Sequence, residues 1–274
     1  MTENYNNNQI ALILLDYVDG LGVRRKNKIL NLVDEPFELI DNIGDLKKDI
    51  IKIASEGIYN AFLNLINGNV IDDILKSLKK LDIKVITYLD NCYPEKLLDI
   101  YDRPVILYAK GNTDLLNKKA ISVAGTRSPS RYGINVCRDF VSELAQAGLV
   151  IVSGFARGID SSAHKMAVEL ELPTIAVVAN GLDIIYPAEN RYLAKMILET
   201  GGLFISEYKL GTKPATYNFP ERNRIISGFA DGLFVPEMTE KSGTQITVSH
   251  ALEQGKNIYV VPGNINSPAS KGTN

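Results

Sequence analysis

The sequence predicts an α/β protein with an extended, Rossmann-like, doubly wound sheet that follows a small all-α domain. Three observations support this prediction. Residues 1–75 carry apolar side chains at helical spacing, the rest of the chain alternates short β-branched runs with helical stretches, and 15 of the 21 glycines follow residue 119. Strands that alternate with helices indicate a parallel sheet covered on both faces.

The all-α part begins with a helix, a tight glycine turn and a second, basic helix. Apolar residues recur at helical spacing over Ile10–Val18, Ile29–Val33 and Ile58–Ile66. The first two helices resemble a helix-hairpin-helix, which points backbone amides at a DNA phosphate without reading the base sequence. A plain αα-corner is the alternative interpretation. The candidate DNA contacts of this hairpin are Gly20, Gly22, Arg24 and Arg25.

The sheet domain is predicted over residues 76–274, with eight strands. Several strands are nearly continuous apolar runs, which is typical of parallel strands buried on both faces. Helical stretches such as Gly133–Ala147 and Ser161–Leu170 provide the crossovers. The predicted strands are Lys84–Leu89, Val105–Ala109, Ala120–Ala124, Val150–Ser153, Thr174–Ala179, Leu203–Ser206, Leu233–Val235 and Ile258–Val261.

Composition excludes several classes of protein. The 30 basic and 32 acidic residues give a net charge of −2, so the chain lacks the bulk positive charge of many nucleic-acid binders. The 2 cysteines, Cys92 and Cys137, suit a reducing cytosol and form neither a disulfide framework nor a zinc module. No signal peptide and no apolar run of the ~18 residues that span a membrane is present. We therefore expect a cytoplasmic protein with no membrane partner.

Three glycine-bearing loops, each followed by a helix, are expected at the carboxyl edge of the sheet. They are Gly125–Ser130, Ser153–Asp160 and Lys241–Thr244. Ligands of open α/β sheets bind at this edge, and helix starts offer unpaired N–H groups to anions. The loops therefore favour a phosphate-type ligand. Tight turns and helix caps with no ligand are the alternative.

Charge placement favours the same edge of the sheet. Residues 121–274 contain 14 basic and 14 acidic side chains, yet five arginines fall in loops or at helix starts. A neutral domain can therefore carry one basic face, although ordinary solvated surface is the alternative and Glu221 could pair with a neighbouring arginine. The five arginines are Arg127, Arg131, Arg157, Arg222 and Arg224.

The sequence contains few features that indicate a catalytic or cofactor site. The first loop lacks the G-x-G-x-x-G pattern of dinucleotide binders, and the strand that ends at Ser153 lacks the Asp or Glu that would bind the hydroxyls of a ribose. His164 follows Asp160 by one helical turn, which suggests either a site or a buried histidine near a helix start. We expect no catalytic residue, no cofactor and no metal ion, since neither metal-ligand spacing nor a G-x-S-x-G elbow occurs.

The motifs together resemble the DprA/Smf family of DNA-processing proteins of bacterial transformation. The N-terminal helices are similar to the SAM-like or helix-hairpin-helix domain of that family. The matching segments, in chain order, are Val123–Arg127 with Ser130, Tyr132-Gly133, Val152–Gly154 with Ala156, Gly158–Asp160, Ala163-His164, Asn180–Asp183, Tyr186-Pro187, Asn190, Ser206-Glu207, Phe219-Pro220, Arg222–Ile226, Ser242–Thr244 and Val261–Gly263.

The resemblance implies a non-enzymatic protein that binds single-stranded DNA, protects incoming strands and loads the RecA recombinase. It also implies a homodimer, with single-strand binding protein as a further partner. Phe155, Phe219 and Tyr217 are candidate base-stacking rings, or else buried lids. The candidate DNA-binding residues are Gly125, Thr126, Arg127, Ser153, Gly154, Lys165, Arg222, Asn223, Arg224, Ser242, Gly243 and Thr244.

The sequence also departs from its family. Family members continue beyond Ser270–Asn274 into another helix, so the chain is either a truncated form or a sheet without its final helix. Val248 and Pro236-Glu237 replace residues that are usual in the family. A related group, the cytokinin-activating phosphoribohydrolases, carries a catalytic glutamate where Thr247 stands here, so a nucleotide-cleaving enzyme is the less favoured alternative. A nucleotide sensor is a third hypothesis.

Overall fold

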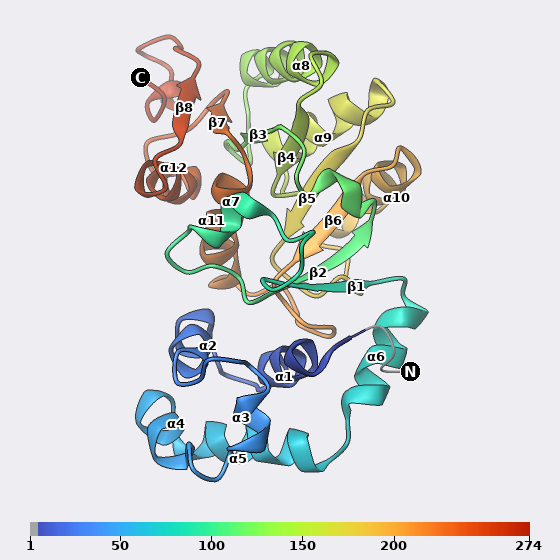
Figure 1. The fold of residues 1–274 in the computed structure, drawn as a ribbon. Coiled ribbons are helices and arrows are strands. Elements are labelled where there is room, and N and C mark those ends of the chain that lie inside the picture. Colours follow the sequence, from blue (N-terminus) through green and yellow to red (C-terminus); the bar gives the residue numbers. More distant parts are fainter. Residues whose placement is uncertain (1–4) are drawn as a thin grey trace. The chain divides into compact units, whose positions relative to one another are not determined.

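The structure, a computed structural model, describes residues 5–274 and divides into two compact units (Figure 1). The first unit contains the chain up to residue 93 together with residues 101–108, and the second contains residues 94–100 and 109–274. The boundary predicted after residue 75 falls within helix α6 (Ile71–Lys80). The division into a SAM-like and a Rossmann domain stays a prediction.

The first unit is mainly helical, as the sequence predicts. Asn6 and Gln9 form a capping box at the start of its first helix. The amide of Gln9 donates to the side chain of Asn6 at 3.0 Å, and the amide of Asn6 donates to the side chain of Gln9 at 2.7 Å. The large buried side chains Leu12, Leu39 and Phe62 fill its core. Its elements are α1 (Asn7–Asp16), α2 (Val23–Leu30), α3 (Glu38–Asp41), α4 (Lys47–Ile53), α5 (Glu56–Asn67), α6, β1 (Lys84–Thr87) and the start of β2 (Ile106–Gly111).

The turn between α1 and α2 has the predicted tight geometry. Gly20 has a φ of +77°, which favours glycine, and extended Gly22 precedes α2 without a side-chain cap. Arg24 pairs with Asp102 at 2.8 Å, whereas Arg25 is exposed. Part of the predicted basic surface of the hairpin is therefore neutralised within the first unit.

Asp16, at the end of α1, is a buried polar centre of the first unit. Its carboxylate accepts a hydrogen bond of 2.6 Å from Lys26 of α2 and another of 2.6 Å from the hydroxyl of Tyr108. A buried carboxylate needs such partners to offset its lost hydration. The contact joins α1, α2 and β2 within this unit.

The second unit contains a parallel sheet in the order β6-β5-β4-β3-β7-β8. All eight predicted strands are present, with ends that differ by one or two residues at most, so the predicted fold class is confirmed. The further elements are α7 (Glu95–Leu98), β3 (Ala120–Val123), α8 (Arg131–Gln146), β4 (Val150–Ser153), α9 (Ile159–Glu169), β5 (Thr174–Val178), α10 (Arg191–Glu199), β6 (Leu203–Ser206), α11 (Asn218–Phe229), β7 (Gly232–Val235), α12 (Thr244–Glu253) and β8 (Asn257–Val260), with 3-10 turns at Thr113–Leu115, Ala188–Asn190 and Pro268–Ser270.

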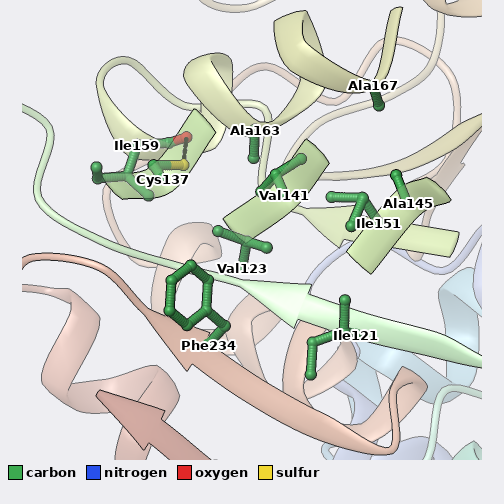
Figure 2. Close-up of a cluster of buried hydrophobic side chains, with 10 residues drawn as sticks. All are labelled: Ile121, Val123, Cys137, Val141, Ala145, Ile151, Ile159, Ala163, Ala167 and Phe234. Carbon is green, nitrogen blue, oxygen red and sulfur yellow. Dashed lines mark hydrogen bonds between the residues drawn. The ribbon is translucent and has the colours of Figure 1, made fainter. Parts of the chain in front are cut away.

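Helices cover both faces of this sheet. On one face α8, α9 and α10 pack side by side, and α11 and α12 cover the other (Figure 1). Figure 2 shows the cluster beneath α8 and α9, where Val141, Ile151 and Phe234 meet side chains from β3, α8 and α9. Cys137 belongs to this cluster and its thiol lies 3.9 Å from the carbonyl of Ile159.

The order of the strands creates a crevice at the carboxyl edge of the sheet. From β3 the chain proceeds outward through β4, β5 and β6, and it then returns to place β7 on the other side of β3. The loops after β3 and β7 therefore leave in opposite directions. Such a switch point is where open α/β sheets bind ligands.

Truncation of Ile151 tests the core in Figure 2. We expect Ile151→Ala to lower the free energy of unfolding by about 2–5 kcal/mol, because it removes buried methyl groups and leaves a cavity. Leu252→Ala, at a side chain that is 66% exposed, should change it by less than about 0.5 kcal/mol. Urea denaturation measures both, and equal effects would contradict the burial of Ile151.

Candidate nucleic-acid interface

A pocket of about 510 Å³ opens in the second unit at the switch point. The loops after β3, β4 and β7 line it together with the first turns of α11. The structure thus brings all three predicted loops to one place. Eight predicted site residues line the pocket, namely Gly125, Thr126, Arg127, Arg222, Asn223, Ser242, Gly243 and Thr244.

Four predicted residues lie elsewhere. Ser153 is fully buried and donates a 2.6 Å hydrogen bond to the carbonyl of Val123, so it is a structural residue. Gly154 lines a smaller neighbouring pocket of about 30 Å³. Lys165 is exposed on α9 and lines neither of these two pockets.

Arg224 is the fourth, and its charge is used inside the protein. The guanidinium is buried, and one nitrogen lies 2.7 Å from both carboxylate oxygens of Glu207. The expectation that Arg224 belongs to a basic face is therefore wrong, because Glu207 occupies its charge.

Two of the loops pack backbone against backbone, and their glycines serve this contact. The amide of Ile159 donates to the carbonyl of Thr126 at 3.2 Å. A Cβ on Gly125 would stand 2.7 Å from the Cβ of Ile159, and one on Gly158 would collide with the Thr126 carbonyl. The sequence analysis predicted that Gly125 lets a phosphate approach the backbone, but the side chain of Ile159 already fills the space beside this glycine.

The three helix starts differ in what they can offer a ligand. At α8, Ser130 caps the amide of Gly133 at 3.1 Å, and the Ser130 amide and hydroxyl donate to Glu237 at 2.7 and 2.6 Å. At α12 the hydroxyl of Ser242 accepts the amide of Thr244 at 3.2 Å, and nothing lies within 4 Å of where a Cβ on Gly243 would stand. The space around Gly243 is therefore open to a ligand.

The pocket lining carries more positive than negative charge. Arg127 and Lys241 are exposed, whereas Arg222 is buried and donates to the carbonyls of Gly154, at 2.5 Å, and Val177. Burial lowers the pKa of Arg222 to about 10, so this side chain stays charged at neutral pH. Asp160 is the acidic residue of the lining, and burial raises its pKa.

Aromatic rings lie beside these charges. The guanidinium of Arg127 lies 5.2 Å from the ring centre of Phe219, which lines both pockets. Tyr186, which the sequence analysis did not select as a stacking ring, lies 5.8 Å from Phe219, and Tyr217 is 75% exposed. Phe155 is buried against Phe204, so its role as a stacking ring is wrong and it belongs to the core.

The histidine that the sequence placed near Asp160 is a core residue. His164 is fully buried, with Nδ1 2.9 Å from the hydroxyl of Thr174, and burial lowers its pKa to about 3. Thr247 lines the large pocket where the phosphoribohydrolases carry glutamate. Its hydroxyl cannot replace a carboxylate as a general acid or base near neutral pH.

The part of the chain that the structure describes offers no group of three or more His, Cys, Asp or Glu side chains arranged to hold a metal ion. Within residues 5–274, no helix has the length and apolar composition needed to cross a membrane.

Comparison with known proteins identifies the family. The model of the family described as DNA recombination-mediator protein A matches residues 84–274, from the first strand onward. The chain belongs to this family. The resemblance to DprA/Smf proteins that the sequence motifs indicated is thereby confirmed.

Individual relatives agree with this assignment. Protein Smf of Escherichia coli is 43% identical over 180 residues, which are 66% of this chain and 48% of Smf, so the chain spans about half the length of that relative. DNA processing protein DprA of Bacillus subtilis is 40% identical over 200 residues, covering 73% of this chain and 67% of that protein.

Two solved structures of family members are similar to this one. DNA processing protein A of Streptococcus pneumoniae matches 98% of this chain and 90% of its own, with a TM-score of 0.79 and 35% identity. The Helicobacter pylori protein, whose structure concerns its single-stranded DNA binding mode, matches 69% of this chain and 85% of its own, with a TM-score of 0.62 and 30% identity.

Gly125 and Gly243 both line the pocket but differ in the space around them, so their alanine variants form a matched pair for a test of stability. We expect Gly125→Ala to destabilise the fold by about 1–3 kcal/mol, because its Cβ would press on Ile159. Gly243→Ala should leave stability within about 0.5 kcal/mol, since its φ is −58° and open space surrounds the site. Thermal unfolding distinguishes the two, and a stable Gly125→Ala variant would contradict the loop contact.

Acid should destabilise the protein partly through His164. Its folded pKa of about 3 lies below the ordinary value of 6.5, so its contribution to stability is complete above pH 6.5 and is lost as the pH falls toward 3. The loss approaches about 1.4 kcal/mol per pH unit. His164→Gln should flatten the dependence of unfolding free energy on pH between 6.5 and 4. His250→Gln is the control, and an unchanged slope in His164→Gln would contradict the depressed pKa.

Proposed function

We propose that the pocket binds single-stranded DNA by its phosphate backbone. The observation that carries this proposal is the convergence of exposed Arg127 and Lys241 with the open space at Gly243 in one pocket. Cationic side chains hold phosphate oxygens, and a glycine lets a phosphate approach the backbone closely. The single-stranded DNA binding mode of the Helicobacter pylori relative supports the same ligand.

The aromatic rings at the pocket favour a flexible single strand over a rigid duplex. Single-strand binders combine a positive groove with rings on which unpaired bases stack, at about 1–3 kcal/mol per base. Phe219 and Tyr186 line the pocket beside the charges, and exposed Tyr217 follows Thr216 of the lining. Phosphates would lie near Arg127 and α12, and bases would stack on these side chains.

The wider role that we propose follows the family. A recombination mediator of this kind would protect incoming single strands and load RecA onto them as a non-enzymatic protein in the cytoplasm. It would act as a homodimer and with single-strand binding protein. The α1–α2 hairpin, with Gly20, Gly22, Arg24 and exposed Arg25, is a second proposed DNA contact.

A nucleotide-cleaving enzyme or a nucleotide sensor is the competing function. The pocket volume would admit a nucleotide monomer, but Thr247 leaves the enzyme without its glutamate. Fluorescence anisotropy with labelled dT oligonucleotides separates these functions. We expect affinity to rise with oligonucleotide length and fall with salt, and AMP to bind weakly and stay intact. Equal affinity for AMP and an oligonucleotide, or hydrolysis of AMP, would overturn the proposal.

Arg127 is the side chain whose loss should weaken DNA binding most cleanly. We expect Arg127→Ala to reduce affinity about tenfold for every sequence and to lower the salt slope by about 0.7, the change for one phosphate contact on a single strand. Lys195→Ala on α10, which removes the same charge from an exposed pair with Glu199, is the control. The Lys165→Ala variant tests whether the site extends to α9. An unchanged affinity in Arg127→Ala would place the DNA elsewhere.

A further inference from the structure

We infer that Glu237 is a positioning residue, which fixes the loop that carries Arg127 in its binding geometry without touching DNA. Glu237 lies two residues beyond the end of β7, and it is only 2% exposed. It does not line the large pocket, so a strand held there would not reach it. This inference rests on the proposed function and names a residue on which that function depends.

The contacts of Glu237 hold both ends of a short loop. Its backbone carbonyl accepts the amide of Thr126 at 3.0 Å. Its carboxylate accepts the amide and the hydroxyl of Ser130 at 2.7 and 2.6 Å. Residues 127–129 lie between these two anchors, and Arg127 is the cation among them. A pair of charge-assisted bonds of this length is strong and directional.

The surrounding sequence accommodates this carboxylate. A Cβ on Gly133, in the first turn of α8, would stand 2.6 Å from one oxygen of Glu237, so only glycine fits there. The Ser130 hydroxyl also accepts the amide of Gly133 at 3.1 Å, which ties the loop to the helix. Glu237 is thus connected to the loop and to the start of α8 at once.

The same residue connects two loops of the pocket. The chain continues from Glu237 through Thr239 and Lys241 to the start of α12, and these residues line the pocket. Because Glu237 bonds Thr126 and Ser130, the loop after β3 and the loop after β7 are held together. The backbone carbonyl provides the bond to Thr126 and the carboxylate provides the two bonds to Ser130, so the carboxylate helps to set the distance between Arg127 and the start of α12.

Positioning and electrostatics predict opposite results when the charge of Glu237 is removed. A carboxylate near a polyanion repels it, so neutralising an acidic residue by itself strengthens DNA binding. If Glu237 instead fixes Arg127, the same change weakens binding. Glu240, which is exposed and three residues further along, is a matched control for the electrostatic effect alone.

The experiment measures anisotropy of a dT oligonucleotide with the full chain and the variants Glu237→Gln, Ser130→Ala and Glu240→Gln, each also combined with Arg127→Ala. We expect Glu237→Gln to weaken binding about fivefold to tenfold and Ser130→Ala to weaken it less. Glu240→Gln should leave affinity equal or higher. In the Arg127→Ala background, Glu237→Gln should change affinity less than twofold, because residues that act through one another are not additive.

Three outcomes would overturn the inference. The first is that Glu237→Gln binds the oligonucleotide more tightly. The second is that Glu237→Gln weakens binding as much in the Arg127→Ala background as alone. The third is that Glu237→Gln fails to fold while Ser130→Ala folds and binds like the unmodified protein. Thermal unfolding of each variant shows which one has folded. Failure of the unmodified protein to bind the oligonucleotide would instead reject the proposed function, so the two failures are distinguishable.

Discussion

The close contact between the loop after β3 and the start of α9 is the constraint on which the pocket depends. The carbonyl of Thr126 accepts the amide of Ile159, and the side chain of Ile159 fills the space beside Gly125. Gly158 approaches the Thr126 carbonyl so closely that no Cβ fits. Because the two backbones are hydrogen-bonded directly, the two loops lie against each other, and Arg127 and Asp160 line the same pocket.

Burial decides which charges remain for a ligand. Arg222 is directed at backbone carbonyls, Arg224 at Glu207, and Arg157 pairs with Glu189 at 2.7 Å. Arg127 and Lys241 are exposed at the pocket. The basic face is therefore smaller than the count of arginines in predicted loops suggested. A small site of this kind is compatible with a net charge of −2, since a few local cations suffice to hold individual phosphates.

The sequence predicted the sheet and the place of the pocket because both depend on local signals. Short β-branched runs such as Val150–Ser153 mark buried parallel strands, and glycine-bearing loops before helices mark the carboxyl edge. Whether a single side chain is exposed to a ligand or buried inside the protein depends on partners that are distant in sequence. Arg224 is neutralised by Glu207 and Phe155 is covered by Phe204, and neither partner is visible in a local pattern. The role of Glu237 was missed for the same reason, because Ser130 lies 107 residues away.

Photo-crosslinking tests the central claim, that a polynucleotide strand lies in the pocket at the switch point, most directly. An oligonucleotide with 5-iodouracil at each position in turn is irradiated with the full chain, and the crosslinked peptides are identified by mass spectrometry. The account predicts crosslinks in the segments 124–128, 216–226 and 239–247, which line the pocket and flank its aromatic rings. Crosslinks confined to the helices of residues 5–80, with none in these segments, would contradict it.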